Sequence, residues 1–392
     1  MLLDGIRVID LTTVVMGPLA TRMLADMGAD VIWIESPEGD VLRDYEPMRS
    51  PKMGAFSMSV SRNKRSVVLD LKTPVGQETM CELIATADVF VTNLRRKAIE
   101  RLGLDEEKVR SLRPDIVYCM ANGFGSDGPN ADKTAYDDVI QAASGLASTF
   151  AWHGGEPRLV PSILADKVAG VHVAFAIAAA LFDRARSGQG ATLEVPMAET
   201  MAAFNLVEHL GGQTFRPQHG DFSYSRIRTP HRRPRRTTDG WIVVLPYSTE
   251  NWHRFFDYAG QPELKHDDRF ATGGERIKHS DELYGLLDDI IKERTTAEWL
   301  AFCAKNSIPA SEVIDLEKIG EHPHFAAVGL LQDDEHPTEG PYRYVRDPIK
   351  VDGEVSPIRH HAPRHGADTE AVLRELGWDE DRIAALRPAD TN

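Results

Sequence analysis

Cysteine is scarce in this chain of 392 residues. Three cysteines occur, Cys81, Cys119 and Cys303, and no two of them form a CxxC pair. Without paired thiols we expect neither a disulfide framework nor a thiolate metal site. This scarcity fits a reducing cytoplasm, where disulfides are rare.

Long hydrophobic runs and a surplus of basic charge are also missing. The longest apolar run, 169–182, contains His172 and is shorter than the roughly 20 residues that span a bilayer. The first residues, MLLDGIRVID, lack the basic start and apolar stretch of a signal peptide. A formal net charge of −15 leaves no general basic face for nucleic acid. We therefore expect a soluble cytoplasmic protein with neither a membrane nor a nucleic-acid partner.

Several catalytic fingerprints are absent. The first βα turn lacks GxGxxG, and the chain has no P-loop, no zinc-ligand spacing and no Gly-x-Ser-x-Gly elbow. These absences disfavour a nucleotide-binding oxidoreductase. They also predict no metal and no tightly bound cofactor.

Strand and helix patterns alternate through the first half of the chain. Apolar strands are expected at 6–12, 31–36, 66–71, 89–94, 115–124 and 191–195, and helices at 17–30, 76–87, 105–112, 137–150 and 164–187. This alternation predicts an α/β fold with a doubly wound, Rossmann-like parallel sheet.

The composition changes between Gly211 and Gly240, where the chain becomes irregular and rich in Arg, His and Pro. We interpret this stretch as a connector into a second, smaller α/β region. Its strand is expected at 241–246, and its helices at 250–259, 280–293 and 296–305. The tail, 368–386, has the pattern of two helices separated by a turn.

Basic side chains gather where strands of the predicted sheet end. They are Lys64, Arg65, Lys72, Arg95, Arg96, Lys97 and Arg101. Gly39, Asp40 and Arg43 follow the second strand, on the side where open α/β sheets bind ligands. Contact with nucleotide phosphates and a merely solvated face both remain open.

One carboxylate, Asp166, opens the long apolar helix VPSILADKVAGVHVAFAIAAAL, which covers 160–181. The helix dipole and the free N–H groups there should lower its pKa and keep it ionised. Such a carboxylate can attack a carbonyl in covalent catalysis, or it can be a plain N-cap. Tyr136 precedes another helix and could flank a polar substrate.

Six segments occur in an order typical of one family. They are GIRVIDLTTVVMGPLATRMLADMGADVIWIESPEGD, NKRSVVLDLK, NLRRKAIERLGL, GFGSDGP, ILADKVAGVHVAFAIAAALFDRARSGQGATLEVPMAE and APRHGADTEAVLRELGW. Almost end to end, the chain resembles the family III CoA-transferases, which include formyl-CoA transferase and carnitine CoA-transferase. Their relative α-methylacyl-CoA racemase shares the fold.

The resemblance implies a large CoA-binding α/β domain from 1–210 and 326–392, and a linker with a small α/β domain from 211–325. It also implies an interlocked homodimer. Asp166 falls on the family's nucleophile, and CoA or acyl-CoA is expected as substrate. The residues implied to bind CoA are Val14, Val15, Met16, Arg43, Leu69, Lys72, Asn93, Leu94, Arg101 and Tyr136.

The chain departs from the family pattern at a few of these positions. Ser36 stands where some members have arginine, so Arg43 is expected to take over a phosphate contact. Val15 replaces the glutamine of formyl-CoA transferase, which disfavours formyl and oxalate substrates. The Arg-rich segment 226–236 either binds an acidic acceptor or CoA phosphates, or is a solvated linker.

Two activities follow from the resemblance. The first is transfer of CoA from an acyl-CoA thioester to a small carboxylic acid through a covalent aspartyl intermediate. The alternative is an isomerase of the α-methylacyl-CoA racemase type. Tyr136 and Asp137 stand where the racemase relatives have a His-Asp pair, and a histidine suits proton abstraction better, so we expect a transferase.

Overall fold

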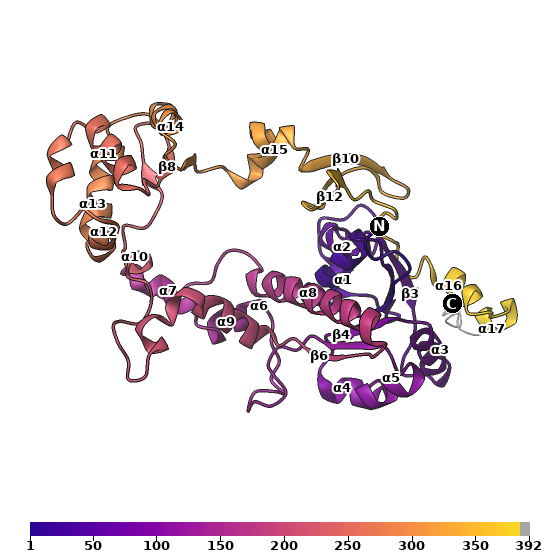
Figure 1. Ribbon diagram of the computed structural model, residues 1–392. Coiled ribbons are helices and arrows are strands. Elements are labelled where there is room, and N and C mark those ends of the chain that lie inside the picture. The colour runs from indigo at the N-terminus through magenta and orange to yellow at the C-terminus, as the bar shows by residue number, and fades with distance from the viewer. Residues whose placement is uncertain (385–392) are drawn as a thin grey trace. The chain divides into compact units, whose positions relative to one another are not determined.

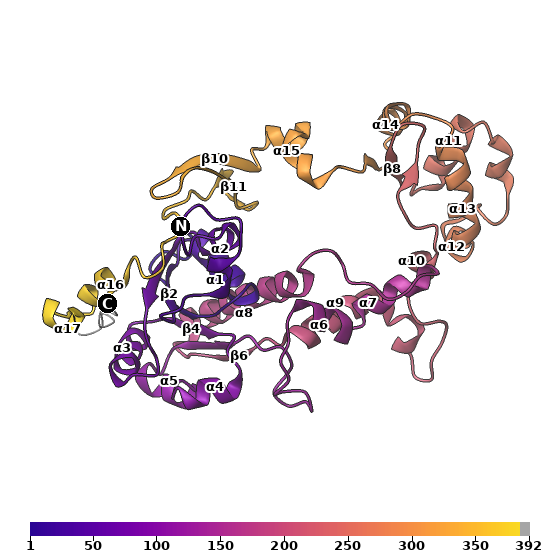
Figure 2. The ribbon, with the colours of Figure 1, turned by 180° about the vertical axis from the view of Figure 1, so that it is seen from behind.

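The computed structural model describes residues 1–384 and divides into two compact units (Figure 1 and Figure 2). Unit 1 contains Met1–Ser144, Val160–Ala202 and the chain from Ala326 onward. Unit 2 contains Gly145–Leu159 and Ala203–Phe325. Unit 1 is therefore built from both ends of the chain, and unit 2 mostly from its middle.

A parallel sheet of six strands forms the centre of unit 1. Its spatial order is β3-β2-β1-β4-β5-β6, and every neighbouring pair is parallel. The strands are β1 Arg7–Leu11, β2 Asp30–Glu35, β3 Lys64–Val68, β4 Val89–Thr92, β5 Val117–Met120 and β6 Thr192–Glu194. This confirms the predicted doubly wound α/β fold.

Helices cover both faces of this sheet, with α3, α4 and α5 on one side and α1 and α8 on the other (Figure 1 and Figure 2). The helices of unit 1 up to the sheet's last strand are α1 Met16–Asp26, α2 Ala55–Ser61, α3 Pro74–Ala85, α4 Arg96–Arg101, α5 Glu106–Leu112, α6 Asp137–Ala143 and α8 Leu164–Ser187. α9 follows at Met197–His209. The predicted single helix 137–150 is wrong, because Gly145 has a φ of 83° and separates α6 from α7 Leu146–Thr149.

The alternation of the strands explains the main core. Ile9, Ile32 and Phe90 point to the face that α3, α4 and α5 cover, and all three are fully buried. The C-terminal helix α16, Thr369–Glu375, joins this layer through Val372. Its first residue also accepts a hydrogen bond from the Val68 N–H at 3.0 Å, so the end of the chain returns to edge strand β3.

The remaining elements of unit 1 follow α15, Pro323–Ala327, which crosses the boundary between the units. Two antiparallel hairpins consist of β10 Leu331–His336 with β11 Gly340–Val345, and β12 Lys350–Val351 with β13 Glu354–Val355. α17, Glu380–Ala384, ends the described chain, so the last residues of the predicted tail helix lie outside it.

Unit 2 is a small α/β body with an antiparallel sheet ordered β7-β8-β9. Its strands are β7 Arg235–Arg236, β8 Trp241–Val244 and β9 Ala310–Glu312. Its helices are α7, the second half of α9, α10 Ser225–Arg228, α11 Thr249–Tyr258, α12 Gly273–Lys278, α13 Ser280–Ile291 and α14 Thr296–Lys305. Capping boxes begin α11 at Ser248 and α14 at Thr295. Trp252, Phe255 and Trp299 are at the centre of its aromatic core.

The helix α8 is long and apolar. Among the described residues it is the one helix that is long and apolar enough to span a membrane, with a mean hydropathy of 1.6 over its best window. The helix has the 24 residues predicted for 164–187, and it is longer than the apolar run 169–182 inside it. Half of that window is buried inside the protein, as in the core helix of many soluble folds.

Candidate active site

Asp166 lies in the first turn of α8, and only 7% of its surface is exposed. The N-cap of this helix is Ile163, and no side chain caps the helix there. Asp166 is therefore inside the helix, and the interpretation of Asp166 as a plain N-cap is wrong. A buried acidic side chain in that position needs another explanation.

A second buried carboxylate, Asp137 at the start of α6, lies against Asp166. The Asp166 N–H donates to Asp137 Oδ1 at 3.1 Å, and Gln141 Nε2 donates to Asp137 Oδ2 at 2.6 Å. Gln141 Nε2 also donates to the Ser162 carbonyl at 3.1 Å, and its Oε1 accepts from the Val160 N–H at 2.8 Å. Gln141 thereby links α6 to the segment before α8.

The pKa of Asp166 is raised to about 6, first by burial and then by the charge of Asp137. A hydrogen bond from the Met16 backbone acts in the opposite direction. The expectation of a lowered pKa is wrong, because loss of water and a like charge outweigh the helix terminus. The carboxylate remains mostly ionised at neutral pH, yet it has less solvent around it than a surface aspartate.

The first βα turn holds a strained backbone beside this carboxylate. Val14 has a φ of 67°, a conformation that β-branched residues rarely adopt. Its N–H donates to Asp40 Oδ2 at 2.9 Å. The Thr13 N–H donates to Asn93 Oδ1 at 2.9 Å, and Asn93 Nδ2 donates to the Thr13 carbonyl at 2.7 Å. The turn leads directly into α1, whose first residue is Met16.

Two glycines allow this turn, α1 and α8 to approach closely. A Cβ on Gly170 would lie 2.8 Å from the Met16 carbonyl oxygen, and a Cβ on Gly17 would lie 2.3 Å from the Thr12 Cβ. Neither position has room for a side chain. Gly170 follows Asp166 by about one helical turn, so the close approach keeps the carboxylate beside the start of α1.

A buried ion pair between Lys64 and Asp10 lies next to the first βα turn. Lys64 Nζ lies 3.1 Å from Asp10 Oδ2 and donates to the Pro18 carbonyl at 2.9 Å. Thr12 and Thr21 hydroxyls donate to the same carboxylate at 2.5 and 2.6 Å. Lys64 is almost fully buried, so this structure contradicts its assignment to a phosphate-contacting cluster.

Arg43 also forms its ion pair and hydrogen bonds with groups inside the fold. Its side chain is 1% exposed and makes a bidentate ion pair with Glu35 at 2.6 and 2.7 Å. The Lys52 and Pro363 carbonyls each accept a further hydrogen bond at 3.1 Å. This geometry contradicts the expected phosphate contact, because the guanidinium faces buried acceptors and not solvent. Arg65 similarly pairs with Asp30 and Glu375.

Several expected CoA-binding residues do meet at one cavity of about 230 Å³ beside the C-terminal ends of the strands. Leu69, Lys72 and Leu94 line it together with Thr13 and the loop 35–40. Leu69 is buried, while Lys72 is exposed at the rim. Among the described residues that line this cavity, Lys72 is the one basic side chain, and the acidic Glu35, Glu38, Asp40 and Asp70 line it as well.

The basic cluster at α4 is separate from that cavity wall and faces solvent. Arg101 is exposed and donates from Nε to the Lys97 carbonyl at 3.1 Å, and Lys97 pairs with Asp132 at 2.7 Å. Tyr136, the residue before α6, is 61% exposed. Val15 and Met16 are buried beneath the turn.

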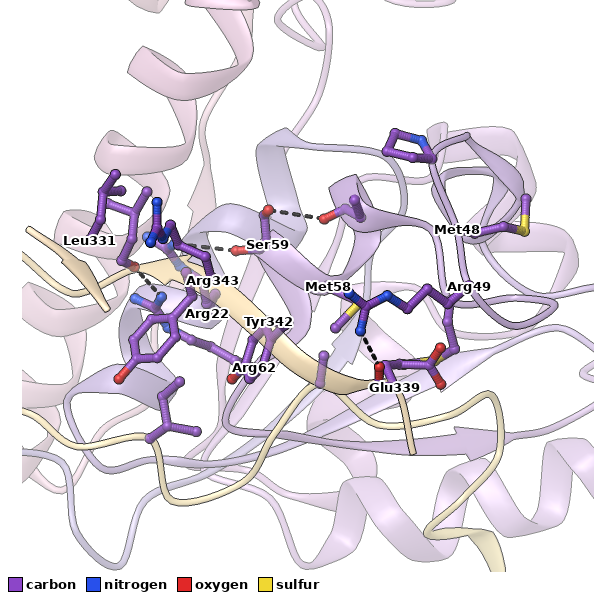
Figure 3. A pocket seen from close by; sticks show the side chains of 17 residues that line it. Arg22, Met48, Arg49, Met58, Ser59, Arg62, Leu331, Glu339, Tyr342 and Arg343 are labelled. Carbon is purple, nitrogen blue, oxygen red and sulfur yellow. Dashed lines mark hydrogen bonds between the residues drawn. The ribbon is translucent and has the colours of Figure 1, made fainter. Parts of the chain in front are cut away.

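A larger cavity of about 510 Å³ lies elsewhere in unit 1, between α2 and the β10–β11 hairpin (Figure 3). Figure 3 shows Arg49 beside Glu339 at one end and Arg22, Arg62 and Arg343 toward the other. None of the residues expected to bind CoA lines it. No cluster of three metal-ligating side chains occurs in residues 1–384.

Sequence reasoning missed two side chains that organise the site. Gln141 looks like an ordinary polar residue of an amphipathic helix, and Asp10 stands alone in an apolar strand. An acidic residue inside a buried strand, with two threonines after the next residue, was a usable signal for Asp10. Nothing in the local sequence distinguishes Gln141.

Comparisons with known proteins agree with this architecture. The model of CoA-transferase family III matches residues 3–369. A formyl-CoA:oxalate CoA-transferase of Afipia carboxidovorans is 30% identical, and the alignment covers 98% of this chain and 96% of that protein. A succinate–glutarate CoA-transferase of Agrobacterium fabrum is 32% identical over 95% of both chains.

Solved structures give the same result. A mutant of Rv3272 from Mycobacterium tuberculosis matches with a TM-score of 0.83 and 27% identity, over 95% of this chain and 98% of that one. A CAIB/BAIF family protein from Brucella suis matches with a TM-score of 0.79 and 27% identity over the same shares. The chain belongs to CoA-transferase family III. It is an enzyme that transfers CoA, and its substrates include CoA thioesters.

Proposed function

We propose that this enzyme moves CoA from an acyl-CoA thioester to a small carboxylic acid, with Asp166 as a covalent nucleophile. The observation that carries the proposal is the placement of Asp166. Its carboxylate is 7% exposed, has a pKa of about 6, and is hydrogen bonded by the backbone of Met16. A partly desolvated, mostly ionised carboxylate beside a fixed N–H donor suits attack on a carbonyl.

The first half-reaction has two steps. Asp166 attacks the thioester carbonyl, the C–S bond breaks, and CoA leaves as a thiolate, which gives an acyl-aspartyl anhydride. The thiolate then attacks the aspartyl carbonyl and expels the donor acid as a carboxylate, which leaves CoA on Asp166. The acceptor carboxylate reverses these steps, forms a new acyl-CoA and frees Asp166.

The Met16 N–H has a direct role in this scheme. When the thiolate attacks the aspartyl carbonyl, negative charge develops on an oxygen of Asp166 itself. The N–H that already bonds this carboxylate in the free enzyme stays in place to stabilise the oxyanion. The strained turn at Val14 and the close approach at Gly170 fix that donor before the reaction begins.

Coenzyme A occupies the cavity beside the sheet in this proposal. Leu69, Leu94 and Thr13 supply its apolar and backbone wall, and Lys72 supplies a cation for a phosphate. Arg101 at the end of α4 provides a second, exposed cation. Asn93 fixes the turn that carries Val14, Val15 and Met16, and Tyr136 contacts the thioester end. Arg43 is left out, because its donors are already engaged.

The acceptor is a small carboxylic acid whose identity we leave to experiment. The named relatives act on formyl-CoA and oxalate, or on succinate and glutarate. Val15, which stands where formyl-CoA transferase has glutamine, disfavours the formyl and oxalate pair here. Purified protein screened against several acyl-CoA donors and acids by mass spectrometry identifies the substrates.

We also propose a cytoplasmic homodimer, interlocked as in the family, with the domains divided at about 210 and 325. The exposed apolar face of α8 supports an interface between copies: Phe175 is 71% exposed and Phe182 is 66% exposed. The three free cysteines fit a reducing compartment.

Trapping tests the covalent step. Enzyme incubated with acyl-CoA and then with hydroxylamine should carry a hydroxamate on the peptide that contains Asp166, found by mass spectrometry. Asp166→Asn should fold yet be nearly inactive, since an amide is a far poorer nucleophile. Full CoA exchange by this variant would contradict the mechanism.

The racemase alternative needs a separate measurement. A transferase exchanges CoA between acids without deuterium uptake at the α-carbon in heavy water, because no α-proton leaves the substrate. Rapid α-deuteration of a branched acyl-CoA, without transfer to any acid, would select the racemase instead.

A further inference from the structure

A cavity of about 280 Å³ lies in unit 2, between the Arg-rich segment, strand β8 and helix α13. Its lining residues are Arg226, Arg232, Arg233, Pro234, Arg235, Val243, Val244, Leu245, Pro246, Tyr284 and Leu287. Four of these are arginines and none is acidic. In a chain with a net charge of −15, this concentration of cations around one cavity requires an explanation.

One carboxylate, Asp288, neutralises this wall only in part. Its Oδ2 bonds His231 Nδ1 at 2.8 Å and Arg233 Nη2 at 2.9 Å, and Arg235 Nε lies 3.3 Å from its Oδ1. Two guanidinium groups therefore share a single carboxylate. Arg226 and Arg232 have no carboxylate within ion-pair distance in the described part of the chain. The cavity keeps a net positive charge.

Arg235 is fixed and incompletely satisfied. Its side chain is 5% exposed, and its Nη2 donates to the His231 and Tyr284 carbonyls at 3.0 and 3.4 Å. Nε makes no hydrogen bond within residues 1–384, despite the nearby Asp288. A buried arginine costs free energy unless its donors are paired. An additional acceptor in the cavity would complete the hydrogen bonding of this guanidinium.

The two remaining arginines offer open donors at the rim. Arg226 Nε donates to the Tyr284 hydroxyl at 2.5 Å, and its guanidinium lies over the Tyr284 ring, so it is already oriented. Arg232 is exposed, and its side chain makes no hydrogen bond or ion pair within residues 1–384. Val243, Leu245 and Leu287 supply apolar surface next to these cations.

We propose that this cavity binds a doubly charged oxyanion group, either a phosphate monoester or the two carboxylates of a dicarboxylic acid. Planar guanidinium groups bind carboxylate and phosphate oxygens in pairs, and the apolar wall contacts the carbon skeleton that bears them. We infer the anion site from the arginines alone. Its assignment to a substrate rests on the proposed function, which supplies both groups: the 3′-phosphate of CoA and the acceptor acid.

Protection from arginine modification tests the site in the full-length enzyme. Phenylglyoxal should label Arg232, and labelling of its peptide is followed by mass spectrometry. Inorganic phosphate should protect Arg232 in a saturable way. If CoA protects while 3′-dephospho-CoA does not, the ligand group is the CoA phosphate. If succinate protects while butyrate does not, it is a dicarboxylic acid.

A variant pair adds a kinetic readout. Arg232→Gln should raise the KM of the protected substrate about tenfold or more, with little change in kcat, as expected for loss of a charge-assisted hydrogen bond. The matched control is Arg236→Gln in the same segment, whose guanidinium lies over Trp241 and does not line the cavity. Arg232→Lys should recover part of the affinity.

Absence of protection by phosphate, CoA and succinate would overturn the proposal, and so would unchanged KM values for Arg232→Gln. Protection requires no turnover, so it separates this inference from the proposed function. If the enzyme shows protection but no CoA transfer, the anion site stands and the transferase mechanism is wrong. If the enzyme transfers CoA but no ligand protects Arg232, only the anion site is wrong.

Discussion

At the scale of single residues, Asp137 and Asp166 are buried next to each other, and the effect of the Asp137 charge on the pKa of Asp166 is measurable. Asp137→Asn removes the like charge but keeps a side chain that can bond Gln141. The pKa of Asp166 should fall, because the charge of Asp137 is one of the causes that raise it. The acidic limb of the pH profile of kcat/KM for the CoA thioester, near pH 6 in the parent enzyme, should move to lower pH.

The neighbouring Asp138→Asn is the control, since Asp138 is exposed and lies outside the network around Asp166. Its pH profile should match that of the parent enzyme. An acidic limb that does not move in Asp137→Asn would mean that burial alone raises the pKa of Asp166.

The raised pKa of Asp166 also affects stability. The folded protein holds this proton up to about pH 6, whereas the unfolded chain releases it near 3.8, so stability falls as the pH rises between these values. At pH 7.5 the ionised group costs about 1–3 kcal/mol. Asp166→Asn should therefore have a higher Tm than the parent at pH 7.5, and the difference should shrink as the pH falls toward 4.5. Thermal unfolding followed by circular dichroism measures both, and a lower Tm for the variant at pH 7.5 would contradict the argument.

Arg43 has a structural role that replaces the expected phosphate contact. Arg43→Gln leaves Glu35 charged and buried without its partner, which costs about 3–5 kcal/mol of unfolding free energy. Adding Glu35→Gln removes the orphaned charge and should restore part of the loss. Urea unfolding of the two single variants and the double variant measures this coupling. A stable Arg43→Gln with a weakened affinity for CoA would return Arg43 to the binding site.

These residues show what the sequence could predict of the site and what it could not. The apolar helix and the resemblance placed Asp166, and the resemblance also implied Leu69, Lys72 and Leu94, which line one cavity. The direction of the Asp166 pKa shift was missed, because it depends on burial and on Asp137, which is 29 residues away. Tertiary packing, not local sequence, determines both the burial of Asp166 and its proximity to Asp137.

At the scale of elements, alternation and periodicity predicted the sheet and α8 well. Apolar strands and a long apolar helix are the patterns that sequence shows most clearly. The start of β3 was missed because Lys64 reads as a surface residue, yet it is buried against Asp10. The break after α6 was missed because a single glycine, Gly145, is compatible with a continuing helix as well as with a left-handed turn.

The contact between α1 and α8 yields a test at the same scale. Gly170→Ala places a methyl group 2.8 Å from the Met16 carbonyl oxygen, so the two helices must separate. We expect a loss of about 1–3 kcal/mol from overpacking and a lower kcat, because Asp166 and the Met16 N–H move apart. Urea unfolding and steady-state kinetics measure the two effects.

A second helical glycine provides the matched control. A Cβ on Gly285 in α13 would meet nothing closer than 3.6 Å, so Gly285→Ala should stabilise the protein by about 0.5–1 kcal/mol through helix propensity. Equal effects of the two substitutions would show that helix propensity, and not the approach of α1 to α8, determines the outcome.

At the scale of the whole molecule, the chain forms two units, and each unit has a hydrophobic core of its own. Unit 1 needs both chain ends, because α16 supplies Val372 to the core beneath the sheet. Unit 2 has its own aromatic core around Trp299. The grouping of 145–159 with unit 2 has no signal in the sequence, since it depends on contacts with residues far along the chain, such as the bond from His153 to the Ile227 carbonyl at 3.0 Å.

The apolar face of α8 leads to the last test, which concerns assembly. Val171, Phe175 and Phe182 are 48, 71 and 66% exposed and lie on one face of the helix. Exposed apolar patches of this kind mark interfaces. Phe175→Asp places a charge on that face and should yield the mass of a single chain by sedimentation equilibrium, at concentrations where the parent is a dimer. Leu316→Asp, at a position 78% exposed, is the control and should remain dimeric. An unaltered dimer in Phe175→Asp would exclude this face of α8 from the interface.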